Sequence, residues 1–329
     1  MKIQQPEIFF QGPASHSPAF KNVIESAGKI AAHNIPVLIE GETGSGKEWL
    51  ARAIHFASPR AARDFISVDC ASFSEVFLEA ELLGYMRGSF AGAIHEKKGL
   101  LELADGGTVF LDHISEMKLA LQGKLYRILN SGTFHKIGGI AEIRVDVRFI
   151  AATDVDLKQF VSKGKFRADL YYQLNAMSIT IPPLRQRRED ILILADWFLA
   201  EVAKRDGAQK KELAKEVQAI LESYDWPANV RQLEREIEKG VILSGSSAKI
   251  RLNHVSSSLM KRKRVTPDPN AVGSGSLKDQ KRKLVGLLER DAIRGALKKT
   301  AGNRTHAAQL LAISRQELLR KISAYKIKL

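Results

Sequence analysis

A glycine-rich segment near the N-terminus constrains the fold of this chain more than any other feature. Residues 41–48 read Gly-Glu-Thr-Gly-Ser-Gly-Lys-Glu and fit the pattern G-x-x-x-x-G-K, with Glu48 where serine or threonine is usual. Such glycines let backbone N–H groups surround phosphates, and Lys47 reaches the β- and γ-phosphates. Because Glu48 offers no hydroxyl to Mg²⁺, the metal must be held in another way. The predicted ATP-binding residues are Gly41, Glu42, Thr43, Gly44, Ser45, Gly46, Lys47 and Glu48.

Short apolar segments alternate with helical patterns through the first half of the chain. The strand candidates are residues 37–40, 65–69, 108–112 and 147–153, and from Pro182 onward the pattern becomes helical. This alternation predicts an α/β fold with a mainly parallel sheet, covered by helices and binding ligands at the carboxyl ends of its strands. We expect a nucleotide-binding subdomain over residues 1–183 and a helical lid subdomain over residues 184–256.

The third strand candidate ends in a carboxylate. Residues 106–112 read Gly-Gly-Thr-Val-Phe-Leu-Asp, the form of a strand that places an aspartate and its Mg²⁺ beside a bound nucleotide. An isolated aspartate at a strand end is more often a turn or cap residue. The phosphate-loop pattern upstream reverses that balance, so Asp112 is the predicted metal ligand.

The net charge of +14 favours a polyanionic partner, and its distribution is uneven. Residues 277–329 contain 14 lysines and arginines against four acidic residues, a net charge of +10. The preceding residues 257–276 include Lys-Arg-Lys-Arg at 261–264 and then prolines, glycines and small polar residues. They are predicted to be a flexible basic linker, whose quartet either contacts phosphate or is simply solvated.

The basic C-terminal segment, residues 277–329, has the pattern of a helix-turn-helix domain. Residues 291–300 read as a helix, and a second helix begins near Thr305, whose hydroxyl is a plausible cap. Leu310 belongs to its predicted packing face, and Ser314 is expected to cap a last helix that ends near Tyr325. The alternative is a small basic bundle for protein contacts. The predicted residues for double-stranded DNA are Asn303, Arg304, Thr305, Ser314, Arg315, Gln316, Arg320 and Lys321.

Several classes of protein are excluded by what the sequence lacks. The apolar runs are far shorter than the roughly 20 residues of a membrane span, and the N-terminus has no signal-peptide pattern. The single cysteine, Cys70, excludes an internal disulfide and a cysteine-rich metal site. We therefore expect a cytoplasmic protein without membrane contact.

Several motifs together resemble the bacterial sigma-54-dependent activators. They are residues 41–48, 104–112 (ADGGTVFLD), 166–172 (FRADLYY), 182–185 (PPLR) and 224–231 (YDWPANVR). The resemblance implies an AAA+ ATPase that forms a hexamer-like ring, binds DNA upstream of a promoter and remodels sigma-54 RNA polymerase by ATP hydrolysis. Glu48 is usual in this family. Because the ATPase begins almost at Met1, we expect no N-terminal regulatory domain, so control comes from elsewhere.

The C-terminal segment adds to this resemblance. Residues 302–315 (GNRTHAAQLLAISR) are similar to the Fis-type DNA-binding domain of the family, with Ala312 where glycine is usual in the turn. Fis-type domains act as dimers. Val285, Leu287 and Leu288 on the preceding helix are candidates for the dimer face or for the core.

The loop that contacts sigma-54 in the family departs from the family pattern. The family form is G-A-F-T-G-A, and Ala91 replaces the threonine that contacts sigma-54. Losing its hydroxyl removes a hydrogen bond worth about 0.5–1.5 kcal/mol. The sigma-contact loop is expected at Gly88, Ser89, Phe90, Ala91, Gly92 and Ala93.

Further departures fall on the residues that hydrolyse ATP in the family. His113 stands in place of the glutamate that polarises the attacking water, and loss of a general base costs about 10²–10⁴ in rate. Arg167 matches the first arginine finger, whereas Gln173 replaces the second. Asp69 and Asp154 each replace an asparagine and add negative charge near the site.

The sequence therefore predicts that the chain keeps the residues for ATP binding and departs from the family at the residues for ATP hydrolysis. The phosphate loop, Asp112 and the lid arginine Arg231 favour binding, whereas His113 and Gln173 weaken hydrolysis. Asp112, His113 and Arg167 are the candidate catalytic residues. Two hypotheses remain open: an ATPase that activates sigma-54 promoters, and a hydrolysis-deficient, ATP-sensing DNA-binding repressor or modulator of a competent relative.

Overall fold

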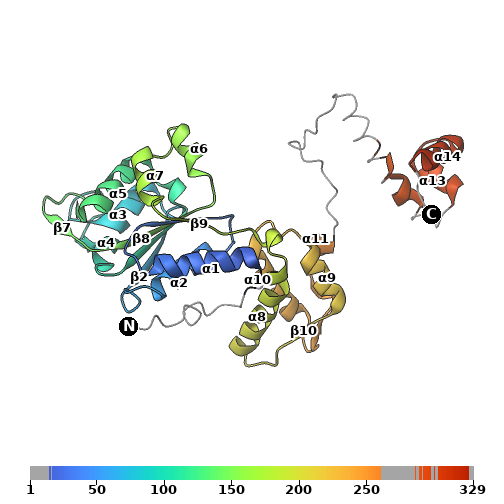
Figure 1. Ribbon diagram of the computed structural model, residues 1–329, viewed down its shortest axis with the longest axis horizontal. Coiled ribbons are helices and arrows are strands. Elements are labelled where there is room, and N and C mark those ends of the chain that lie inside the picture. The colour runs from blue at the N-terminus through green and yellow to red at the C-terminus, as the bar shows by residue number, and fades with distance from the viewer. Residues whose placement is uncertain are drawn as a thin grey trace. The chain divides into compact units, whose positions relative to one another are not determined.

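The computed structural model describes residues 15, 17–260, 286, 289–290, 292–297, 300 and 303–325 (Figure 1). The chain divides into two units, Met1–Lys261 and Arg262–Leu329, and each unit is described by itself. Most of the predicted linker, residues 261–276, lies outside the described residues, as do Val285, Leu287 and Leu288. Within the described part of the chain, no helix is both long and apolar enough to cross a membrane.

A parallel sheet forms the centre of the first unit. Its five strands lie in the order β2-β5-β8-β1-β9, and every pair of neighbours is parallel. The predicted strands are confirmed, except that the fourth begins one residue later. In register, Asp69 lies opposite Asp112 at the carboxyl ends of their strands. The strands are β1 (Val37–Glu40), β2 (Phe65–Asp69), β5 (Thr108–Asp112), β8 (Arg148–Thr153) and β9 (Ser178–Thr180).

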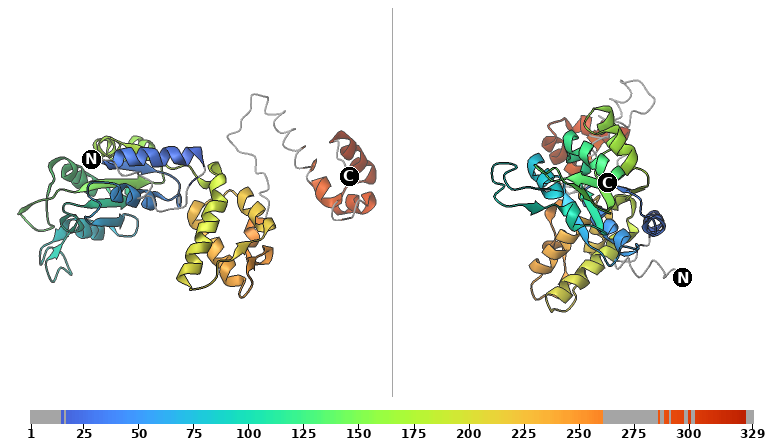
Figure 2. Two further views of the ribbon diagram at one scale, coloured as in Figure 1. Left: turned by 60° about the horizontal axis from the view of Figure 1, so that its bottom comes forward. Right: turned by 90° about the vertical axis from the view of Figure 1, so that its left-hand side faces the viewer.

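Helices cover both faces of this sheet, as Figure 1 and the left view of Figure 2 show. Alternate residues of a strand point to opposite faces, so Val37 and Ile39 pack with α1 (Pro18–Ala31) and α2 (Lys47–Phe56). Leu38 packs on the other face. The second face is covered by α3 (Glu75–Leu83), α4 (Leu100–Leu103), α5 (Leu119–Ser131), α6 (Leu157–Ser162) and α7 (Ala168–Leu174).

Two short hairpins and a turn complete this subdomain. β3 (Gly84–Tyr85) pairs antiparallel with β4 (Lys97–Lys98), and β6 (Thr133–His135) pairs antiparallel with β7 (Glu142–Arg144). The 3₁₀ turn η2 (Ile114–Glu116) follows β5.

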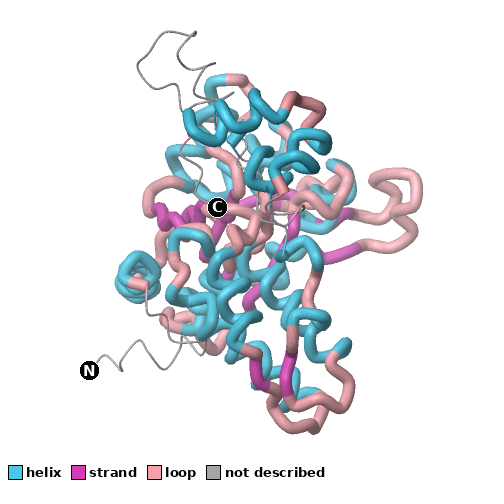
Figure 3. Tube along the Cα trace, turned by 90° about the vertical axis from the view of Figure 1, so that its right-hand side faces the viewer, coloured by secondary structure: helices cyan, strands magenta, loops and turns pink. Residues whose placement is uncertain are grey.

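The lid follows the sheet and is mainly helical (Figure 3). Its core surrounds Trp226, which is fully buried and whose indole N–H donates to the carbonyl of Leu221 at 2.9 Å. Leu259 is buried in the same core, so the first four residues of the predicted linker pack with the lid. The elements are η3 (Leu184–Gln186), α8 (Glu189–Arg205), β10 (Glu212–Leu213), α9 (Lys215–Ser223), α10 (Asn229–Leu243), β11 (Lys249–Ile250), η4 (Leu252–His254) and α11 (Ser257–Met260).

The described residues of the C-terminal unit include helical residues at 292–297 and, after them, the two helices α13 (Arg304–Leu310) and α14 (Arg315–Ala324). The cap of the first is Asn303, whose side-chain oxygen accepts from the N–H groups of Thr305 and His306, so the expected Thr305 cap was wrong. The Ser314 cap is confirmed by its bond from the N–H of Glu317 at 3.1 Å. The core contains Ile293, Ala296, Leu297, Ala307, Ala308 and Leu318.

Two residues of this unit differ from the sequence expectation or carry backbone strain. Leu310, predicted to pack inward, is 57% exposed because it ends α13 on the side away from the core. Ala312 has φ of 53° in the turn between the helices, a left-handed conformation that favours glycine. This strain accounts for the preference for glycine at such a position.

Candidate nucleotide-binding site

The phosphate loop connects the end of β1 to the start of α2. Gly44 and Gly46 have φ of 74° and 106°, which only glycine adopts without strain. A Cβ atom added at Gly46 would meet nothing within 4 Å, so the loop backbone faces open space there. The Lys47 ammonium donates to the carbonyls of Gly41 at 2.9 Å and Glu42 at 3.4 Å. Phosphate oxygens can replace these two carbonyls as acceptors.

A cavity of about 170 Å³ lies beside this loop and brings several predicted residues together. Lys47, Asp112 and His113 border it from the α/β subdomain, and Arg231 borders it from the lid. Burial lowers the pKa of Lys47, whereas the charges of Asp112 and Asp154 raise it, and burial prevails. Glu48 also lines the cavity, but its carboxylate is paired with Arg52 at 2.7 Å.

Asp112 is placed to hold a cation at this cavity. Its Oδ1 accepts the backbone N–H of His113 at 2.9 Å, which orients the carboxylate at the end of β5. One carboxylate fits Mg²⁺, which in nucleotide sites takes most of its other ligands from phosphates and water. The described residues contain no cluster of three or more histidine, cysteine or acidic groups that could hold a metal alone. The donor set thus fits a cation that arrives with a nucleotide.

His113 and Asp69 form a pair next to Asp112. The distance from His113 Nδ1 to Asp69 Oδ1 is 2.8 Å, and because a carboxylate accepts, Nδ1 carries the proton. Burial raises the pKa of Asp69, but hydrogen bonds from Ser72, His113 and Ala71 outweigh it and leave that pKa below its ordinary value. His113 has φ of 50° and ψ of 45° in the left-handed region. The imidazole N–H therefore binds the carboxylate that Asp69 adds to the site.

Asp154, the other aspartate that stands where the family has an asparagine, contacts the phosphate loop. Its Oδ2 accepts from the Thr43 hydroxyl at 2.8 Å, a contact that the side-chain amide of an asparagine makes equally through its oxygen. Its carboxylate fixes the Thr43 side chain rather than lining the cavity.

The finger candidates lie away from this cavity. Arg167 precedes α7 and its guanidinium makes two bonds to Asp169, at 3.0 and 2.7 Å. Gln173 lies on the same helix. Neither residue is part of the cavity lining.

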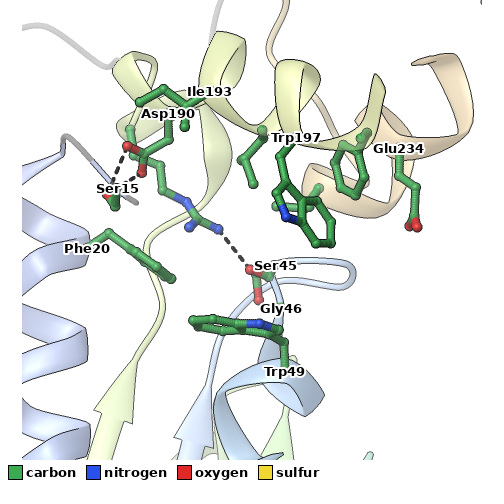
Figure 4. Close-up of a pocket in the computed structure, with 13 residues that line it drawn as sticks. Ser15, Phe20, Ser45, Gly46, Trp49, Asp190, Ile193, Trp197 and Glu234 are labelled. Carbon is green, nitrogen blue, oxygen red and sulfur yellow. Dashed lines mark hydrogen bonds between the residues drawn. The ribbon is translucent and has the colours of Figure 1, made fainter. Parts of the chain in front are cut away.

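A second, mostly apolar cavity of about 290 Å³ adjoins the phosphate loop, and sequence reasoning missed it (Figure 4). Phe20 of α1, Trp49 of α2 and Trp197 of α8 border it. The Arg187 guanidinium lies 4.2 Å from the centre of the Phe20 ring and donates to the Ser45 carbonyl at 2.8 Å. The sequence signals were the tryptophan directly after Lys47-Glu48 and the aromatic pair at residues 197–198.

The predicted sigma-contact loop, residues 88–93, is folded back on its own base. Phe90 is half-buried, and its ring packs edge-on against Tyr85 with centroids 4.9 Å apart. The N–H of Gly88 donates to the Ala93 carbonyl at 2.8 Å, which closes the loop. A Cβ atom added at Gly138, before β7, would come within 2.6 Å of the Ser89 Cβ, so the two segments are in contact. Ala91 and Gly92 are exposed at the tip.

The predicted DNA-binding residues form an exposed polar surface on the C-terminal unit. Arg315, Gln316 and Arg320 are exposed on α14, the second helix of the helix-turn-helix. Asn303, Arg304, Thr305 and Ser314 are exposed as well. Lys321 differs, because its ammonium is paired with Glu289 at 2.7 Å and is partly buried.

The fold and this site define an AAA+ P-loop module followed by a helix-turn-helix domain. The diagnostic features are the strand order with a phosphate loop after β1, the acidic end of β5 and the helical lid that supplies Arg231. Matches to known families agree: the Sigma-54 interaction domain matches residues 14–180, the AAA+ ATPase lid domain matches residues 185–271, and the Fis family of bacterial regulatory proteins matches residues 285–325.

Individual relatives are similar over most of the chain. Regulatory protein AtoC of Escherichia coli (strain K12) is 39% identical over 95% of this chain, which covers 67% of AtoC. The Nif-specific regulatory protein of Azotobacter vinelandii is 45% identical over 70% of this chain, which covers 44% of that protein. The structure of NtrX from Brucella abortus in complex with ADP is 27% identical, with a TM-score of 0.72 over 98% of this chain and 71% of NtrX.

The chain therefore belongs to the family of sigma-54-dependent transcriptional activators with a Fis-type DNA-binding domain.

Proposed function

We propose that this chain binds ATP with Mg²⁺ between its α/β subdomain and lid, and that it regulates transcription from DNA bound by its C-terminal domain. The observation that carries the proposal is the convergence of Lys47, Asp112 and Arg231 on one cavity. Two positive groups and one carboxylate at that cavity match the needs of a Mg²⁺ triphosphate. NtrX from Brucella abortus, which has been solved in complex with ADP and with ATP, supports nucleotide binding by this chain.

Each group has a distinct task in this proposal. The loop N–H groups and the Lys47 ammonium bind the β- and γ-phosphates, and Arg231 binds the terminal phosphate from the lid. Asp112 would hold Mg²⁺, which would offset the charge of the phosphates. The apolar cavity bordered by Trp49 and Trp197 takes the base, because aromatic side chains exclude water from its faces.

We further propose that ATP is bound readily and hydrolysed slowly. His113 replaces a fixed negative charge by an imidazole whose Nδ1 is bound to Asp69, which leaves Nε2 as the acceptor for a water proton. Gln173 cannot neutralise phosphate charge, and an arginine finger contributes about 10³–10⁵ to turnover. In this form the chain senses ATP, and its effect on a promoter follows from the state of the bound nucleotide.

A second candidate is an active motor that remodels sigma-54 RNA polymerase. Arg167 and Phe90 favour it, because both match residues that serve a motor and only a neighbouring copy in a ring would use Arg167. Ring assembly, a dimeric arrangement on DNA, sigma-54 contact through the loop at 88–93 and a cytoplasmic site of action all belong to this proposal.

Steady-state ATP hydrolysis and equilibrium ATP binding, measured together with Mg²⁺ over a range of protein concentrations, test these proposals. ATP binding with negligible turnover at every concentration supports the ATP-sensing regulator. Turnover that rises steeply as the protein assembles supports the motor instead. Failure to bind ATP at all would show that the site assignment is wrong.

A further inference from the structure

The carboxylate of Glu42 points away from the phosphate cavity, toward the lid. Both its oxygens accept from the Arg185 guanidinium, at 2.7 and 2.6 Å, in a two-bond pair. Its Oε2 also accepts from the side-chain amide of Asn229 at 3.2 Å. Arg185 belongs to η3 and Asn229 begins α10, so one acidic side chain of the loop binds two separate elements of the lid.

An acidic residue in a phosphate-binding loop requires a physical reason, because its charge repels phosphate. Here Arg185 supplies a compensating charge in the planar geometry that makes arginine–carboxylate pairs strong. The hydrogen bonds from Arg185 hold the pKa of Glu42 below its ordinary value against the opposing effect of burial. Glu42 therefore stays ionised and bound to the lid, and the phosphate groups meet only its backbone.

The first turn of α10 also rests directly on the loop backbone. The N–H groups of Val230 and Arg231 donate to the Gly44 carbonyl at 2.9 and 3.3 Å. Helix N-termini leave such donors without partners inside the helix, and here the loop satisfies them. Contact is close: a Cβ atom added at Gly44 would lie 2.3 Å from the Ala228 carbonyl oxygen.

Asn229 connects these contacts. Its side-chain oxygen accepts the N–H of Leu184 at 2.7 Å, and its amide donates to the Thr43 carbonyl at 3.1 Å as well as to Glu42. It is fully buried and has φ of 51°, a left-handed conformation that asparagine tolerates better than most residues. The residue thus joins η3, the loop and α10 in one hydrogen-bonded junction.

We propose that Glu42 is a positioning residue that locks the phosphate loop to the lid, through Arg185 and Asn229, and thereby presents Arg231 to the terminal phosphate. The inference rests on the proposed nucleotide site but concerns contacts between protein groups, which can be tested without a nucleotide. Because Arg231 follows Asn229 by two residues on α10, movement of this junction moves Arg231 with it. The lock makes the loop and the first turn of α10 shift together.

Hydrogen exchange of the nucleotide-free full-length chain tests the lock directly. In Glu42→Gln and in Arg185→Gln, we expect the amides of Val230 and Arg231 to exchange about tenfold faster, since each variant removes a charged partner from the junction. The double variant should be no faster than either single one. Arg185→Lys, which keeps the charge but loses the two-bond geometry, should lie between.

Arg188→Gln is the matched control. Arg188 is three residues from Arg185, but it is paired with Asp225 at 3.0 Å and bonded to the Glu222 carbonyl, both within the lid. It should leave exchange at Val230 and Arg231 unchanged. Unchanged exchange in the Glu42 and Arg185 variants would overturn the proposal. Faster exchange along the whole of α10 would overturn it too, because that pattern marks general loss of lid stability.

Nucleotide preference tests the consequence for Arg231. With Mg²⁺, Glu42→Gln should reduce the preference for a non-hydrolysable ATP analogue over ADP about tenfold, because only the former carries the terminal phosphate. In the background of Arg231→Ala, the same substitution should change that preference little. An unchanged preference in Glu42→Gln would show that the junction does not present Arg231. If the parent chain binds neither nucleotide, the proposed function fails, while the exchange measurement still decides the lock.

Discussion

Two parts of one site differ in how closely they keep the pattern of the family. The predicted binding part comprises the phosphate loop, Asp112 and Arg231, and one cavity is bordered by Asp112, Arg231 and most of the loop from Thr43 to Glu48. The hydrolytic part has His113 bound to Asp69 and Gln173 where an arginine finger is expected. Affinity for a nucleotide and the rate of its hydrolysis depend on separate groups, so a chain can retain one without the other.

Restoring the hydrolytic part should have the largest effect. His113→Glu alone would place two carboxylates together, so Asp69→Asn must accompany it, along with Gln173→Arg. We expect this triple variant to hydrolyse ATP at least about 10³-fold faster than the parent, the lower end of the finger contribution alone, because the base and finger contributions do not simply add. Steady-state phosphate release measures the gain, and adding Lys47→Ala should abolish it. If the triple variant hydrolysed ATP as slowly as the parent, these three residues would not be the ones that distinguish hydrolysis from binding.

Removing a group from the binding part should lower the affinity for ATP, and not only the rate of ATP hydrolysis. We expect Lys47→Ala to weaken ATP binding about 100-fold, because charge-assisted bonds to phosphate contribute about 1.5–3 kcal/mol each. Calorimetric titration with a non-hydrolysable ATP analogue measures this loss. Lys158→Ala, an exposed lysine on α6, should bind like the parent. Equal affinity in Lys47→Ala would remove the central residue from the binding part.

Gly44 and Gly46 of the phosphate loop both have left-handed backbone conformations, but substitutions at the two positions should affect different properties, stability at one and nucleotide binding at the other. Alanine is strained at both by about 1–2 kcal/mol, but only at Gly44 does a new Cβ strike the lid backbone. We therefore expect Gly44→Ala to lose more free energy of unfolding than Gly46→Ala. The latter should chiefly lose nucleotide affinity, because its Cβ enters the space for phosphate. Urea unfolding and nucleotide titration of both variants decide the point, and equal stability losses would contradict it.

The smallest expected effect concerns a buried histidine on α2, the helix that follows the phosphate loop. His55 of α2 is fully buried, with Nε2 donating to the Arg63 carbonyl at 3.1 Å and Nδ1 accepting from Thr108 at 2.9 Å. Burial lowers its pKa below the ordinary value of 6.5. The unfolded chain therefore binds this proton more readily, so the stability from His55 is complete above pH 6.5 and is lost as the pH falls below it.

Urea unfolding at a series of pH values measures this contribution. His55→Gln, which does not titrate, should show a weaker fall in stability below pH 6.5 than the parent. His33→Gln, at an exposed histidine, should follow the parent curve. If the stability of His55→Gln falls as steeply with decreasing pH as that of the parent, groups other than His55 cause the fall.

Much of the fold was predictable because its signals are local. Apolar runs bounded by turns located four of the five strands of the sheet to within one residue but missed β9, and the loop at 41–48 with the acidic end of β5 indicated the candidate site. The prediction was less precise where two nearby residues could both cap a helix. Asn303 and Thr305 are both good caps, and the chain uses Asn303 because its side chain reaches two N–H groups. Leu310 was misjudged because helical period alone does not show where α13 ends.

The class of the fold, the phosphate loop and the charge of the C-terminal segment follow from the amino-acid sequence alone, since each depends on residue types at short spacing. The contacts between distant segments depend on the tertiary structure. The pairing of Asp69 with His113 depends on the register of β2 against β5. The junction of Glu42 with Arg185 depends on how the lid docks. The aromatic cavity requires α1, α2 and α8 to meet, and no local pattern specifies that meeting.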